Sequence, residues 1–278
     1  MQQVTRKTLG AGINLTCVTT PKFKRAVLRT MLVLPLGGED AALRACLPQV
    51  LRRGTARLND MQAFGTALDE LYGARIEAAV RKEGENLCIG FLSDCIDEAY
   101  APGADGLTAG VIGLLCDLLY NPYLQDGLFC VAYVEGERGN LIDRIAALKN
   151  DPRSWAPRRL SEIMCENEDY GKSALGTIEQ AERITPETLY AAYRRALSEA
   201  QVELFYCGTM MPDEVEAHFM ATPLAQPREG TLYQPHTVVQ ARPAGDIREI
   251  VEDAEVTQGK LSLGFRTGGA SLTGGEPA

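Results

Sequence analysis

The stretch from Leu34 to Thr55 decides the fold, and it reads Leu-Pro-Leu-Gly-Gly-Glu-Asp-Ala-Ala-Leu-Arg-Ala-Cys-Leu-Pro-Gln-Val-Leu-Arg-Arg-Gly-Thr. An apolar strand leads through Gly37-Gly38 into a segment whose apolar residues recur at the spacing of a core-facing helix: Leu43, Cys46, Leu47, Val50 and Leu51. Pro48 lies inside this helix, where it removes a backbone donor and crowds the carbonyl of Arg44. A buried helix in such a place can carry metal ligands or a general base, yet this one offers alanine, cysteine, leucine, proline and glutamine.

The composition is that of an ordinary soluble globular protein of 278 residues, long enough for one large domain or two smaller ones. A net charge of −9 argues against a general nucleic-acid binder, because such a protein needs a basic face. No run of about 18 apolar residues is present, so we expect no membrane span. The start, Met1 to Lys7, lacks the basic-then-apolar design of a signal peptide.

The eight cysteines indicate a reducing compartment rather than a disulfide framework. No two of them form a C-x-x-C pair, and most lie among apolar residues. Without an export signal, buried free thiols in the cytoplasm are the best interpretation. We therefore expect a cytoplasmic protein.

The two histidines, His218 and His236, restrict the possible chemistry. A zinc hydrolase usually needs two or three imidazoles, and a classical triad needs one beside its nucleophile. His218 lies in a predicted amphipathic helix and His236 in a proline-rich connector, so neither is a good catalytic candidate.

The patterning predicts an α+β fold in which an antiparallel sheet is flanked by helices. Residues 13–19 and 26–36 read as strands that pair across a turn near Pro21-Lys22, and residues 74–81 and 87–92 read as a hairpin. A further core strand is expected at 202–207. Helices are expected at residues 43–51, 61–71, 107–119, 126–148, 152–163, 178–181, 186–197 and 212–221.

Glu137 is the unusual residue of the longest predicted helix, because it lies on the apolar stripe between Val134 and Leu141. An isolated buried charge is costly. We expect this carboxylate either to reach solvent or to pair with an arginine such as Arg138 or Arg144.

The chain divides into three predicted parts. Residues 1–222 form the first α+β domain, and residues 223–245, rich in Pro, Gln and Thr, form a linker. Residues 246–278 contain two further predicted strands, Ile247–Val251 and Val256–Phe265, before a glycine-rich tail. Since two strands rarely form a stable domain, they either join the first domain or open a second, truncated repeat.

The succession of elements resembles the N-terminal half of the pitrilysin/insulinase family of metallopeptidases, which includes the mitochondrial processing peptidase. The resemblance covers nearly the whole chain, and its fragments are Leu51-Arg52-Arg53-Gly54-Thr55, Leu68-Asp69-Glu70-Leu71-Tyr72-Gly73-Ala74, Val134-Glu135-Gly136-Glu137-Arg138, Tyr170-Gly171, Leu175-Gly176-Thr177, Ile184-Thr185-Pro186-Glu187-Thr188-Leu189, Phe205-Tyr206-Cys207-Gly208 and Gln258-Gly259-Lys260-Leu261-Ser262-Leu263-Gly264-Phe265. Each fragment alone is weak evidence, whereas their order and spacing are moderately specific. The resemblance implies the first repeat of that family's α/β roll, followed by the start of a second.

In active members of that family this first helix carries H-x-x-E-H, with two histidines on zinc and a glutamate that activates water. Counting back from Gly54-Thr55, the five positions hold Ala45, Cys46, Leu47, Pro48 and Gln49. Of the family's distal acidic motif, Glu137 matches the third ligand. The resemblance therefore makes Ala45, Pro48, Gln49 and Glu137 the positions of a degenerate motif, and we expect no catalytic residue, metal or cofactor.

Three functions follow from these observations. The leading hypothesis is a catalytically inactive partner that forms a heterodimer with an active homologue and holds an extended peptide. Such a protein is similar to the bacterial non-peptidase members of the family, which include those linked to modification of elongation factor P. The Leu71-Tyr72-Gly73-Ala74 helix end, followed by a hairpin with Lys-x-Gly, suggests that subgroup. The alternatives are an enzyme of another class that uses Cys46 or carboxylates, and a truncated chain without independent function.

Overall fold

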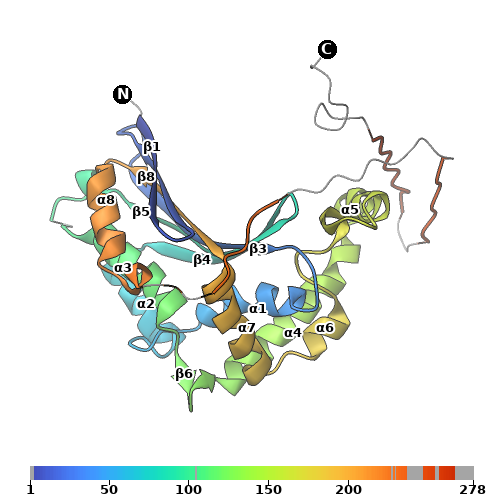
Figure 1. The fold of residues 1–278 in the computed structure, drawn as a ribbon, viewed down its shortest axis with the longest axis horizontal. Helices are drawn as coiled ribbons and strands as arrows, with labels where there is room; N and C mark the ends of the chain where they lie inside the picture. Colours follow the sequence, from blue (N-terminus) through green and yellow to red (C-terminus); the bar gives the residue numbers. More distant parts are fainter. Residues whose placement is uncertain are drawn as a thin grey trace.

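A six-stranded sheet with helices over one face forms the centre of the computed structural model, which describes residues 3–103, 105–226, 228, 230–236, 247–253 and 257–266 (Figure 1). The strand order is β1-β2-β8-β3-β5-β4. Among these strands β2 and β8 are parallel, and the other neighbouring pairs are antiparallel. The predicted α+β class, with an antiparallel-dominated sheet flanked by helices, is confirmed. The strands are β1 (Gln3–Gly10), β2 (Ile13–Thr19), β3 (Arg25–Pro35), β4 (Arg75–Glu83), β5 (Asn86–Ile96) and β8 (Gln201–Gly208).

The helices form two layers beneath the sheet (Figure 1). Those that pack directly against strands include α1, α3, α7 and α8, while α4 packs on α1 and α6. The helices are α1 (Ala41–Leu51), α2 (Met61–Glu70), α3 (Leu107–Tyr120), α4 (Val131–Ala147), α5 (Pro152–Met164), α6 (Ile178–Glu182), α7 (Pro186–Glu199) and α8 (Pro212–Met220). None of the helices in the described part of the chain is both long and apolar enough to cross a membrane.

The predicted antiparallel pairing of residues 13–19 with residues 26–36 is wrong. Strand β8 lies between β2 and β3, parallel to the first and antiparallel to the second. Its inward residues Val202, Leu204 and Tyr206 are buried, so a strand from the end of the domain supplies the middle of the sheet. A local turn signal near Pro21-Lys22 cannot reveal this insertion, and the polar, exposed edge strand β1 was not predicted either.

The predicted helix 126–148 begins later than expected, at Val131. Asp126 and Gly127 both have positive φ, 51° and 81°, and form the turn of a short hairpin between β6 (Leu124–Gln125) and β7 (Leu128–Phe129). Asp-Gly is the usual sequence of such a two-residue turn, because both central residues need a left-handed backbone. The local turn preference therefore prevails over the apolar periodicity at this point.

The C-terminal part of the chain differs from the expectation of two strands. Residues 247–253 and 257–266 form no strand where the structure describes them, and residues 254–256 lie outside the described part. The described residues lie along α5, where Arg159 pairs with Glu252 at 2.7 Å and Arg248 with Glu166 at 3.0 Å. The glycine-rich tail from residue 267 onward, and residues 227, 229 and 237–245 of the predicted linker, also lie outside the described residues, and the three-part division stays a prediction.

The centre of the sheet depends on a close approach of two backbones at Gly90 of β5. Its φ is +152°, and a Cβ added there would lie 2.0 Å from the carbonyl oxygen of Thr30 in β3. Because the obstacle is backbone rather than a flexible side chain, the neighbouring strands β3 and β5 would have to separate.

We predict that Gly90→Ala lowers the free energy of unfolding by more than about 3 kcal/mol, the upper end of ordinary single substitutions. The matched control is Gly113→Ala in α3, where an added Cβ meets nothing within 4 Å. There the better helix propensity of alanine should raise stability by up to about 1 kcal/mol. Urea unfolding followed by circular dichroism measures both changes, and equal stabilities of the two variants would contradict the prediction.

Candidate functional site

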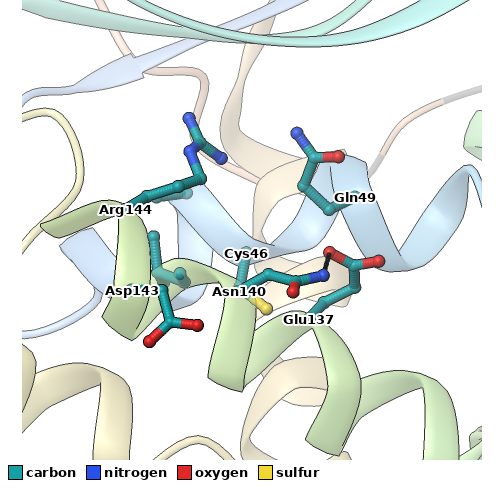
Figure 2. A pocket seen from close by; sticks show the side chains of 8 residues that line it. Cys46, Gln49, Glu137, Asn140, Asp143 and Arg144 are labelled. Atoms are coloured by element: carbon teal, nitrogen blue, oxygen red, sulfur yellow. Dashed lines mark hydrogen bonds between the residues drawn. The ribbon is translucent and has the colours of Figure 1, made fainter. Parts of the chain in front are cut away.

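The candidate site is a cavity of about 440 Å³ between α1 and α4, and the structure brings three of the four predicted motif positions to it. Ala45 and Gln49 enter from α1, one helical turn apart, and Glu137 enters from α4. Figure 2 shows the cavity with its polar side chains. The remaining lining residues are Cys46, Asn140, Leu141, Asp143 and Arg144.

The fourth motif position, Pro48, is buried in α1 and does not line the cavity. The helix continues across it, since the backbone N–H of Arg52 donates to the Pro48 carbonyl at 3.1 Å. Between β3 and α1, Gly37 and Gly38 both have a φ of +82°, which allows the chain to turn sharply into the helix. The side chain of Arg44 stabilises this turn by donating to the carbonyls of Pro35 and Gly37.

An ion pair with Arg53 neutralises Glu137. The Arg53 Nε donates to Glu137 Oε1 at 2.6 Å, and its terminal nitrogen lies 2.5 Å from the same oxygen. Asn140, one turn further along α4, donates to the other carboxylate oxygen at 3.1 Å. Glu137 is 7% exposed, so both of its oxygens are satisfied inside the protein rather than by bulk water.

The expected partners of Glu137, Arg138 and Arg144, do not pair with it. Arg138 donates to the carbonyl of Ile184 at 3.1 Å, and Arg144 has no hydrogen-bond or ion-pair partner among the described residues. Asn140 could have been found from its helical spacing to Glu137. Arg53 gave no such signal, because the sequence does not show that the end of α1 lies against the middle of α4.

Cys46 forms part of the cavity wall and is 1% exposed. Burial, and to a smaller extent the nearby charge of Glu137, raise the pKa of its thiol to about 12. A thiol in this state is protonated at neutral pH and is a poor nucleophile. The arrangement therefore does not support the alternative of a cysteine enzyme.

The residues of the cavity do not fit a zinc ion. Ala45 has no donor atom, and Gln49 offers an amide. Of the two α4 carboxylates, that of Glu137 already binds a guanidinium and that of Asp143 points away from Gln49 and Glu137 (Figure 2). His218 lies in α8, and His236 is an exposed residue whose ring contacts that of Tyr233, so neither lines the cavity. Among the described residues there is no cluster of three or more histidine, cysteine, aspartate or glutamate side chains that could hold a metal.

Comparison with known proteins places the chain among relatives of known family. A protein of Bacillus subtilis (strain 168) named "Probable inactive metalloprotease YmfF" is 30% identical over 262 residues, which cover 94% of this chain and 61% of that protein. A conserved protein from Enterococcus faecalis V583 superposes with a TM-score of 0.75 at 24% identity over 82% of this chain and 54% of its own. The inactive domain of an M16 peptidase from Pseudomonas fluorescens superposes with a TM-score of 0.63 at 14% identity, over 84% and 53%. No family model matches.

The chain is a homologue of the pitrilysin-like (M16) metalloproteases. The resemblance seen in the sequence is thereby confirmed, and the two structural likenesses add the fold alone. The homologue spans less than two thirds of the length of each of these relatives. That Ala45, Pro48, Gln49 and Glu137 stand where active members hold their zinc ligands and general base stays a prediction.

We predict that Arg53→Met destabilises the homologue by about 1 to 3 kcal/mol, because it leaves the buried carboxylate of Glu137 with Asn140 as its remaining partner. Arg53 is one-third exposed, which keeps the expected value below that of a fully buried pair. The double variant Arg53→Met with Glu137→Met should recover most of the loss. A double-mutant cycle by urea unfolding gives the coupling, and a coupling near zero would show that the pair carries no stability.

We also predict that Cys46 resists alkylation by iodoacetamide at neutral pH in the folded homologue. The half-buried Cys130, at the start of α4, provides the internal comparison. Peptide mapping by mass spectrometry should find Cys130 modified well before Cys46. Rapid, stoichiometric modification of Cys46 would instead support the cysteine-enzyme alternative.

Proposed function

We propose that this homologue is a non-catalytic, peptide-holding half that completes a chamber together with an active homologue carrying the zinc motif. The observation that carries the proposal is the free edge of β4 beside a cavity whose residues do not fit a zinc ion. Strand β4 ends the sheet order, and α1 packs against it on one side and against α4 on the other. An extended peptide can add to such an edge as a further strand.

The hydrogen-bond pattern of β4 identifies the groups that such a peptide would meet. Glu83 and Asn86 flank a two-residue turn and pair with each other, so their N–H and C=O groups face one another. Alternation along the strand then turns the backbone groups of Ile76, Ala78 and Val80 outward. The side chain of Arg52 donates to the Ile76 carbonyl at 2.6 Å, whereas Ala78 and Val80 have no outward partner among the described residues.

The opposite edge of the sheet is less suited to a peptide. Strand β1 contacts α8, and Lys7 of β1 pairs there with Asp213 and Glu216. Charged side chains and contacts with a helix protect an edge from further pairing. We therefore assign peptide holding to β4.

The partner and the compartment form part of the same proposal. The match to about half to three fifths of the relatives' lengths supports a chamber that this chain does not form by itself. The eight cysteines are free, and five of them are buried, which supports the cytoplasm as the compartment. The net charge of −9 favours neither a nucleic acid nor an anionic membrane surface as the partner.

We predict that the isolated chain holds no stoichiometric zinc and cleaves no unfolded protein. Elemental analysis after dialysis, and incubation with reduced, carboxymethylated casein followed by mass spectrometry, measure the two properties. One tightly bound zinc per chain, or cleavage that a chelator abolishes, would overturn the non-catalytic assignment.

Peptide holding is tested with Val80→Pro and the matched variant Val80→Ala. Proline at an outward position removes one free donor of the edge but no hydrogen bond to β5. A random library of peptides about ten residues long, passed over the immobilised protein and eluted into a mass spectrometer, should be retained by the native chain and by Val80→Ala. Val80→Pro should lose most of the retention, and equal retention by all three proteins would contradict binding at this edge.

A further inference from the structure

Arg144 is an exposed arginine of α4 that lines the cavity between α1 and α4 and that no described residue neutralises. The charge of Arg53 is matched by Glu137 at 2.5 Å, and Asn140 satisfies the second oxygen of that carboxylate. Arg144 lines the same cavity and has no hydrogen-bond or ion-pair partner among the described residues. Gln49, across the cavity on α1, likewise has none.

The directions of these side chains decide what the cavity can take. In Figure 2 the side chains of Arg144 and Gln49 extend to the same side, while the carboxylate of Asp143 points the opposite way. The neighbouring acid therefore does not neutralise Arg144 within the cavity. A guanidinium and an amide N–H₂ that face one space are both donors, and a carboxylate accepts from both.

We infer that this cavity receives an aspartate or glutamate side chain of the peptide held on β4, with Arg144 as its charge partner and Gln49 as a second donor. The inference rests on the proposed function. A cationic side chain fits the cavity less well, because the one buried carboxylate there is already paired and the other points away. An apolar side chain would accept no hydrogen bond from Gln49 and would not neutralise the charge of Arg144.

The position of the cavity suits a side chain from that peptide. Helix α1 lines the cavity and contacts β4 directly, and Arg52 at its end donates to the edge carbonyl of Ile76. Alternate residues of an extended peptide point to the same face, so one or two of them can turn toward α1. A cavity of about 440 Å³ is large enough for a carboxylate side chain together with water.

The test divides the same random peptide library into sublibraries with a fixed central residue: glutamate, glutamine, lysine or leucine. The full chain is immobilised as the native protein, as Arg144→Gln and as Arg194→Gln. Arg194 is an exposed arginine of α7 outside the cavity, so its removal changes the net charge equally. We expect the native chain and Arg194→Gln to retain the glutamate sublibrary at least about threefold over the glutamine one, the range of an exposed ion pair. Arg144→Gln should reduce this ratio to near one.

The possible outcomes distinguish failure of the carboxylate site from failure of peptide holding. Retention of all sublibraries with a glutamate-to-glutamine ratio near one in the native chain overturns the carboxylate site and leaves peptide holding intact. A ratio that persists in Arg144→Gln, or that Arg194→Gln abolishes equally, also overturns it. If the native chain retains no sublibrary above a column without protein, peptide holding itself fails. Raising the salt concentration should lower the ratio in the native chain, because the contact is electrostatic.

Discussion

The burial of α1 between the sheet and α4 is the constraint on which the rest of this structure depends. The helix packs against β4 and β5 above and α4 below, so residues 45–48 are removed from water. In such a position a polar side chain must find a partner inside the protein. The apolar residues of α1 need none, and the one acid that faces it, Glu137, is held by Arg53.

This arrangement explains how the fold accommodates a buried glutamate at this position. A buried glutamate on α4 would be costly if no cation balanced it. The guanidinium of Arg53 supplies that balance, and its contact with the Tyr133 ring, 5.9 Å from the centroid, holds it against α4. The cavity therefore keeps its walls while its polar contacts differ from those of a zinc centre, and the unpaired Arg144 gives it a different electrostatic character.

The same burial relates the cavity to the edge of the sheet. Since α1 contacts β4 directly, the free edge and the cavity lie on neighbouring sides of one helix. The chain thus has two features suited to an extended peptide, an edge with outward backbone groups and a cavity that could receive a side chain. Neither feature requires a catalytic residue.

The sequence by itself determined most of the helices, the β4–β5 hairpin, the fold class and the absence of histidine and carboxylate side chains from α1, because these depend on local periodicity and on residue types at known spacing. It also placed Glu137 on a buried stripe. Only the tertiary structure decided that β8 lies between β2 and β3, and that Arg53 rather than Arg138 or Arg144 pairs with Glu137. Both are contacts between residues far apart in the chain, which arise from packing and leave no local pattern. The start of α4 was decided by a local signal, because the two-residue Asp126-Gly127 turn ends the helical periodicity that the sequence continues through it.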